Sequence, residues 1–189
     1  IIENPKVLYV PYARMQDNYS DCEEYFRNEM GNGRYNSIKL LDNKTYYDAN
    51  EFDDYNVIYL GGGSVPQLLK FVYTTHFDNV LRNWNEKDKI IIGSSAGAII
   101  LGKDARMYRD FPEDVSYSLG LNLCGECSFV CHYIKDGFYK QWSAVEIQHK
   151  ILEYINTGFS RVIAMPEEAA IVWDRGGKMK MVINTVTEY

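Results

Sequence analysis

The sequence predicts an α/β fold with a mostly parallel β-sheet that carries helices on both faces. Short apolar segments bounded by turn residues alternate with segments of helical periodicity, which is typical of parallel sheets. Hydrophobic residues make up 46% of the 189 positions, enough for one core of ordinary size. We therefore expect residues 1–189 to form a single domain. Because the chain begins with Ile1 rather than Met, we also expect a further N-terminal piece, with room for another strand.

The composition narrows the classes of partner. The net charge is −6, and Lys and Arg are scattered, so we expect neither a nucleic acid nor a membrane surface as partner. Apolar runs stay well below the roughly 20 residues of a membrane span, and no leader precedes them. Four cysteines are too few for a disulfide scaffold, which favours a reducing compartment. The sequence predicts a cytoplasmic protein with a small or peptidic ligand and leaves the oligomeric state open.

The first half of the chain begins with an apolar strand at Lys6–Val10. Ser20–Glu23 has the spacing of a capping box, which satisfies unpaired amides at a helix start. We expect that helix to run to about Met30, where the glycines of 31–33 stop it. A short strand at Ser37–Leu41 follows.

The next strand, Tyr55–Leu60, runs straight into Gly61–Ser64. A helix should follow, with the serine as its cap and Pro66 in its first turn. His76–Glu86 is a second helical segment. Lys89–Ile92 is apolar at consecutive positions, which predicts a central strand.

The second half is expected to contain a long loop, four strands and one amphipathic helix. In chain order these are the loop 103–125, the strand Ser128–Tyr133, the helix Ser143–Ile155, the strands Arg161–Met165 and Ala169–Trp173, the turn Asp174–Gly177 and the strand Lys178–Ile183.

The turn between the strand at Lys89–Ile92 and the next helix carries the candidate nucleophile. Gly93 and Gly97 flank Ser95 with the Gly-x-Ser-x-Gly spacing of a strand-to-helix elbow, in which small neighbours relieve crowding around an exposed serine. Ser94 is the alternative nucleophile, but it does not fit the Gly-x-Ser-x-Gly spacing. The alternative is a turn of small residues that only lets a helix pack closely on a sheet.

The glycine run Gly61–Gly63 ends a strand and precedes a helix, so it should lie at the same carboxyl edge of the sheet as Ser95. Its amides could donate hydrogen bonds to an oxyanion, with the amide of Ala96 as the second donor. Phosphate binding fits less well because Pro66 stands where a dinucleotide fingerprint needs its last glycine. A purely structural tight turn stays open.

Three histidines could act as the base. His149 lies on the polar side of a helix and His76 opens one, whereas His132 ends an apolar strand at a sheet edge and is our choice. Glu167 and Glu168 follow another strand, and either carboxylate could orient the imidazole.

Cys124, Cys127, Cys131 and His132 offer ligand types for zinc within a short segment. If 128–133 is a strand, however, Cys131 and His132 point to opposite faces and cannot both reach one metal ion. We therefore expect no metal and no cofactor.

Taken together, these motifs resemble the serine peptidase family typified by dipeptidase E (aspartyl dipeptidase) and cyanophycinase. Residues 7–13 resemble its early strand, 61–64 its glycine turn and 93–98 its nucleophile turn. His132 ends a strand where that family places its base, and Pro166-Glu167 resembles the segment that supplies its acid.

The resemblance implies a Rossmann-like sheet akin to class I glutamine amidotransferases and a triad of Ser95, His132 and Glu167. Glutamine amidotransfer itself is disfavoured, because those enzymes carry cysteine at the elbow. The implied reaction is hydrolysis of a small peptide through an acyl-enzyme, with the amides of Gly63 and Ala96 as oxyanion donors. The family often has glycine after the acid, and Glu168 at that position keeps Glu168 open as the alternative acid.

Cleavage beside an acidic residue would need a cation for the substrate carboxylate, and Arg106 and Arg109 are the nearest candidates in sequence.

Two other functions stay open. An α/β-hydrolase esterase has its acid before its histidine, which here would be Asp104 or Asp114. A non-catalytic binding domain would keep the fold alone.

Overall fold

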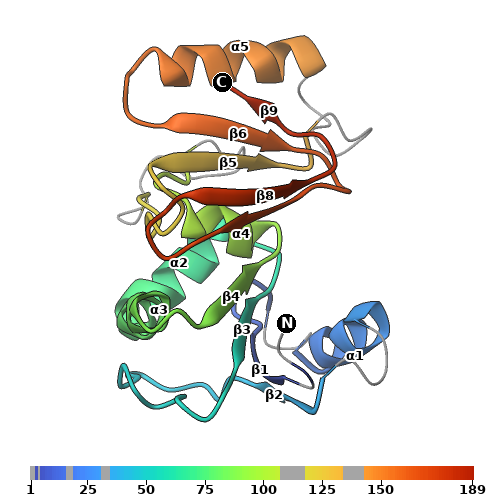
Figure 1. The fold of residues 1–189 in the computed structure, drawn as a ribbon, viewed down its shortest axis with the longest axis vertical. Coiled ribbons are helices and arrows are strands. Elements are labelled where there is room, and N and C mark those ends of the chain that lie inside the picture. The colour runs from blue at the N-terminus through green and yellow to red at the C-terminus, as the bar shows by residue number, and fades with distance from the viewer. Residues whose placement is uncertain (1–2, 4, 16–18, 31–34, 107–117, 134–142) are drawn as a thin grey trace. The chain divides into compact units, whose positions relative to one another are not determined.

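The structure is a computed structural model that describes residues 3, 5–15, 19–30, 35–106, 118–133 and 143–189. The chain separates into two compact units, residues 1–97 and residues 98–189. Figure 1 shows the strands and helices of each unit.

The first unit is built on a parallel sheet of four strands in the order β2-β1-β3-β4. The strands are β1 (Lys6–Val10), β2 (Ser37–Leu40), β3 (Val57–Leu60) and β4 (Ile90–Gly93). All three pairings are parallel, as the sequence predicts.

The expected central position of β4 is wrong for the described sheet, where β4 pairs with β3 and ends the strand order. The prediction failed because the consecutive isoleucines show only that this strand is apolar. An apolar sequence alone does not distinguish a central strand from an edge strand.

Helix α1 (Tyr19–Met30) lies on one side of this sheet, and α2 (Val65–Thr74) and α3 (Phe77–Glu86) lie on the other (Figure 1). Val7 and Tyr9 of β1 share a buried cluster with Phe26 of α1, so the alternate residues of β1 face the other side.

The predicted start of α2 is confirmed. Ser64 accepts a hydrogen bond from the amide of Gln67 at 3.3 Å, and Pro66 lies in the first turn. Helix α3 begins at Phe77, one residue later than expected, because His76 is its N-cap with a φ of 59°.

The chain enters the second unit through α4 (Ala96–Leu101), and the described part of the second unit contains two small sheets and one longer helix. Its elements are β5 (Cys127–Cys131), α5 (Ala144–Ile155), β6 (Arg161–Met165), β7 (Ala170–Trp173), β8 (Met179–Ile183) and β9 (Thr187–Glu188). Strands β5 and β6 are parallel, and β9 adds to β6 in the antiparallel direction.

Strands β7 and β8 form an antiparallel hairpin around the expected turn Asp174–Gly177. Strand β9 was not predicted, since two residues are too few to carry an alternating pattern. Most of the pairings across both units are parallel, so the predicted fold class is confirmed.

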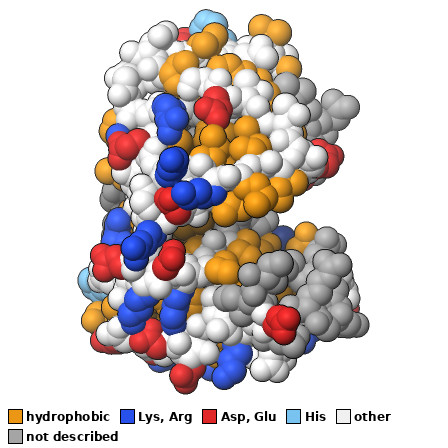
Figure 2. Space-filling model, in the orientation of Figure 1, with side chains coloured by type: hydrophobic (Ala, Val, Ile, Leu, Met, Phe, Trp, Pro, Cys, Tyr) orange, Lys and Arg blue, Asp and Glu red, His pale blue; other side chains and the backbone are white. Residues whose placement is uncertain are grey.

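Acidic and basic side chains are interspersed on the face drawn in Figure 2 rather than gathered by sign. Among the described helices, none is long and apolar enough to cross a membrane.

Candidate active site

The turn at Ser95 joins β4 to α4 through a strained residue. Ser95 has a φ of 50°, a left-handed conformation that residues with a side chain seldom adopt. Hydrogen bonds hold both sides of the turn, from the Ser94 amide to the Leu60 carbonyl at 3.0 Å and from the Gly97 amide to the Ser94 carbonyl at 2.9 Å. The predicted strand-turn-helix arrangement around Ser95 is therefore present.

Gly97 has a steric reason to be glycine. A Cβ at this position would lie 2.2 Å from the carbonyl oxygen of Leu60 and 2.7 Å from the Leu60 Cβ. The absence of a side chain lets the start of α4 approach the end of β3 and keeps the Ser95 turn close to that strand.

The glycine turn after β3 lies against Ser95, so the structure brings together the two loops that the sequence predicted at one sheet edge. A Cβ on Gly62 would be 3.2 Å from the Cβ of Ser95 and 3.8 Å from its Oγ. Gly63 has a φ of 143°, and a Cβ there would be 2.3 Å from the Ala13 carbonyl oxygen. Within the described residues, neither the Gly63 amide nor the Ala96 amide donates to a backbone carbonyl.

In the second unit, His132 and Glu167 lie side by side. Each follows the end of a strand, and the parallel register of β5 and β6 pairs Cys131 with Met165, so both residues leave the sheet at one edge. Nδ1 of His132 forms a hydrogen bond with Oε1 of Glu167. This contact orients the imidazole and favours the tautomer that carries its proton on Nδ1.

The other ionisable candidates lie elsewhere. The backbone carbonyl of Glu168 accepts a hydrogen bond from Asn184 at 2.6 Å, and its side chain is not the one that meets His132. His149 pairs with Glu153 on the exposed surface of α5 at 3.4 Å. His76 occupies the N-cap position of α3, and its side chain makes no capping hydrogen bond there.

Arg106 pairs with the buried acid Asp104, which the sequence offered only as a candidate acid of an esterase. Its Nε donates to Oδ2 of Asp104 at 2.7 Å, and its guanidinium lies 4.9 Å from the centre of the Phe159 ring. Asp104 is fully buried and also accepts a hydrogen bond from Tyr154 at 2.9 Å. The Asp104 carboxylate raises the pKa of Arg106 and competes with any substrate carboxylate. Arg109 and Asp114 lie outside the described residues.

All four cysteines are present as buried thiols. Burial raises the pKa of Cys124 and of Cys131 to about 12, which disfavours the thiolate that zinc requires. Cys127 lies 3.2 Å from a guanidinium nitrogen of Arg161. Among the described residues, no group of three His, Cys, Asp or Glu is placed to hold a metal ion.

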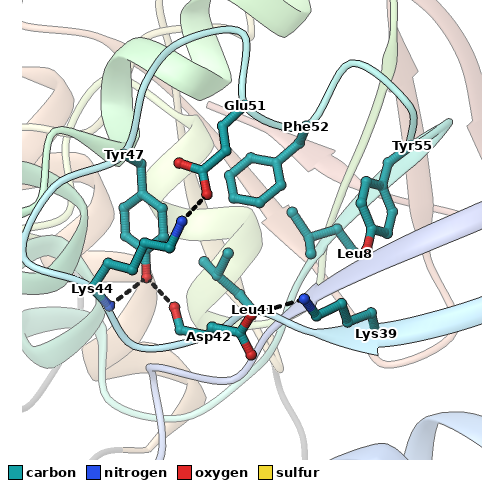
Figure 3. Close-up of a pocket in the computed structure, with 9 residues that line it drawn as sticks. All are labelled: Leu8, Lys39, Leu41, Asp42, Lys44, Tyr47, Glu51, Phe52 and Tyr55. Carbon is teal, nitrogen blue, oxygen red and sulfur yellow. Dashed lines mark hydrogen bonds and ion pairs between the residues drawn. The ribbon is translucent and has the colours of Figure 1, made fainter.

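A separate pocket of about 200 Å³ lies beneath the connection from β2 to β3 (Figure 3). Its charged groups satisfy one another, because Lys39 pairs with Asp42 at 2.8 Å and Lys44 pairs with Glu51. The remaining lining is mainly apolar and aromatic, so the pocket holds no evident acid, base or nucleophile pair. The lining side chains are Leu8, Lys39, Leu41, Asp42, Lys44, Tyr47, Glu51, Phe52 and Tyr55.

Comparison with known proteins identifies one family. The sequence model of peptidase family S51 matches residues 2–182. Peptidase E of Haemophilus influenzae (strain PittGG) is 27% identical over 106 residues, which are 56% of this chain and 44% of that protein. Peptidase E of a second Haemophilus influenzae strain gives the same identity, with 48% of its length covered. The match therefore spans about half the length of these curated relatives.

Solved structures share the fold. A putative peptidase E protein from Listeria monocytogenes superposes with a TM-score of 0.62 at 17% identity, covering 100% of this chain and 87% of that one. A peptidase from an acI-B1 Actinobacterium gives a TM-score of 0.64 at 22% identity, covering 91% of this chain and 71% of that one. At these identities, the likeness shows a common fold.

Proposed function

Because the chain belongs to peptidase family S51, we propose that it is a serine peptidase that hydrolyses a dipeptide or another small peptide, with Ser95 as the nucleophile. The observation that carries this proposal is the strained conformation of Ser95 with the glycine turn packed against its side chain. A strained backbone at a serine is costly, and such strain persists mostly where function uses it.

The proposed reaction proceeds through an acyl-enzyme. Oγ of Ser95 attacks the scissile carbonyl carbon while His132 accepts the hydroxyl proton, and the carboxylate of Glu167 stabilises the imidazolium that forms. His132 then returns the proton to the leaving amine. Water, activated by the same imidazole, releases the acid product and regenerates Ser95. The contact between Nδ1 of His132 and Glu167 supports these two roles.

We propose the amides of Gly63 and Ala96 as donors to the oxyanion. The closeness of the glycine turn to Ser95 supports this assignment, as does the lack of a backbone acceptor for either amide among the described residues. Donors of this kind, aimed at charge that develops in the transition state, are worth roughly 10²- to 10³-fold in kcat each.

A preference for acidic substrates would use Arg106 or Arg109, and the ion pair of Arg106 with Asp104 makes Arg109 the better candidate. Substitution of Arg109 by Ala should then lower kcat/KM for dipeptides with an N-terminal aspartate more than for those with alanine. Equal effects on both peptides would remove this role.

A cytoplasmic location, which the buried thiols support, belongs to the same proposal.

Labelling with a fluorophosphonate probe tests the nucleophile. Wild-type protein and a Ser94→Ala control should be labelled, and Ser95→Ala should not. His132→Ala should slow labelling strongly, because the imidazole activates the hydroxyl. Equal labelling of the wild type and Ser95→Ala would refute the proposal. If neither protein is labelled, the binding-domain alternative would stand. Ester hydrolysis without peptide hydrolysis would favour the esterase.

A further inference from the structure

The glycine turn is fastened by the segment that follows β1, at residues 13 and 14. The amide of Ser64 donates to the carbonyl of Ala13 at 2.7 Å. Nε of Arg14 donates to the carbonyl oxygen of Gly62 at 3.3 Å. The side-chain amide of Gln67 donates to the carbonyl of Arg14 at 2.7 Å. These bonds link segments about 50 residues apart, so they fix the turn relative to β1.

The bond to Gly62 acts on the peptide group that contains the Gly63 amide. In a trans peptide the carbonyl oxygen of one residue and the N–H of the next lie in one plane and point in opposite directions. A donor held on the Gly62 oxygen therefore also sets the direction of the Gly63 N–H. Glycine on both sides leaves this plane with little intrinsic preference, so the direction depends on the external contact.

Arginine is well suited to this contact. Its guanidinium stays charged at every working pH, and a charge-assisted hydrogen bond is stronger than a neutral one. A cation on the carbonyl oxygen also polarises the peptide group, which makes its N–H a better donor. The same contact would thus aim the Gly63 amide and strengthen it.

We propose that Arg14 is a positioning residue of the oxyanion hole, which holds the Gly62–Gly63 peptide so that the Gly63 amide faces the charge formed at Ser95. This inference rests on the proposed function. The distance of 3.2 Å between a Cβ built on Gly62 and the Cβ of Ser95 places the peptide beside the nucleophile. Arg14 itself touches the far side of the peptide and acts through it.

The test compares Arg14→Gln with Arg27→Gln. Arg27 is the matched control because it is an exposed arginine of α1 whose ion pair is with Glu23. The probes are 4-nitrophenyl acetate and its thiono analogue, whose sulfur accepts hydrogen bonds poorly. Hydrolysis by Ser95→Ala is subtracted as background. The unfolding midpoint of each variant is measured in parallel.

We expect Arg14→Gln to lower kcat for the oxygen ester by about 10- to 100-fold, part of the effect of losing a whole oxyanion donor. KM should change little, and the thiono ester should lose much less. Arg27→Gln should match the wild type on both probes, and Arg14→Lys should recover part of the rate by restoring the charge. A role in stability alone would slow both esters equally, which overturns the inference.

The failure of each idea gives a distinct result. If wild-type hydrolysis of both esters equals that of Ser95→Ala, the proposed function fails, and the inference fails with it. If the wild type has Ser95-dependent activity and Arg14→Gln keeps the ratio of oxygen to thiono rates, only the positioning role fails. A rise in KM alone would instead assign Arg14 to substrate binding. If Arg14→Gln does not fold, Gln67→Ala, which frees the Arg14 carbonyl, must shift the same ratio for the inference to stand.

Discussion

Replacement of Gly97 by alanine tests the close approach of α4 to β3. Helix propensity alone predicts that alanine at this helical position stabilises the protein by about 1 kcal/mol. The structure predicts the opposite sign. The new Cβ would lie 2.2 Å from the Leu60 carbonyl oxygen and 2.7 Å from the Leu60 Cβ, where ordinary contacts begin at 3.4 Å. Both atoms belong to or adjoin the backbone of a paired strand and cannot rotate away.

Relief of this overlap requires α4 to move away from β3 by about 1 Å. Overpacking of this kind costs about 1–3 kcal/mol, and we expect the upper end because backbone must move. After the gain in propensity the net loss is roughly 2 kcal/mol, or about 4–8 °C in Tm for a chain of this length. Thermal unfolding followed by circular dichroism measures the shift.

The control for this prediction is Gly176→Ala. A Cβ on Gly176 meets only a side-chain oxygen of Asp174, at 3.3 Å, so we expect a change within about 0.5 kcal/mol. Fluorophosphonate labelling of Gly97→Ala should also fall, because the Ser95 turn moves with the helix start. A Tm for Gly97→Ala at or above the wild-type value, with full labelling, would show that the approach of helix and strand is not as tight as described.

Three further predictions concern other parts of the site. Glu167→Gln should lower kcat by up to about 10⁴-fold with little change in Tm, whereas Glu168→Gln should stay near wild type; the reverse order in a kinetic assay would make Glu168 the acid. Gly62→Ala, with its new Cβ at 3.2 Å from the Cβ of Ser95, should slow labelling by roughly 10-fold while Tm changes by only a few degrees. Because burial raises the pKa of Cys124 and Cys131 from the ordinary thiol value of 9.0 to about 12, the unfolded chain ionises these thiols first, and stability should fall as pH rises above about 9. Urea unfolding measured across that range would contradict this if the midpoint stayed constant.

The predictions that hold from sequence alone depend on local chemistry. A serine before a proline at a helix start satisfies amides within the same turn, so Ser64 and Pro66 identify the start of α2. The Gly-x-Ser-x-Gly spacing around Ser95 can likewise be recognised within five residues, although the steric reason for Gly97 is its contact with the distant Leu60. Such signals need no knowledge of the remainder of the chain.

The features that the sequence did not reveal depend on distant contacts. Arg14 meets Gly62 across 48 positions, and Asp104 meets Tyr154 across 50; neither spacing leaves a periodic trace. Glu167 and Glu168 are adjacent glutamates with the same chemistry. They differ only in the direction in which the backbone points each side chain. The hydrogen bond to His132 distinguishes the two in the structure.

The two halves of the proposed site are held by different kinds of interaction, and this difference predicts how each half fails. The nucleophile half depends on missing side chains, since Gly63 and Gly97 each leave no room for a Cβ beside backbone atoms. Substitutions there should lower stability and activity together. The base half depends on the parallel register of β5 and β6, which delivers His132 and Glu167 to one edge whatever their side chains are. Substitutions of those two residues should therefore remove activity and leave the sheet intact, so plots of activity against Tm should separate the two sets of variants.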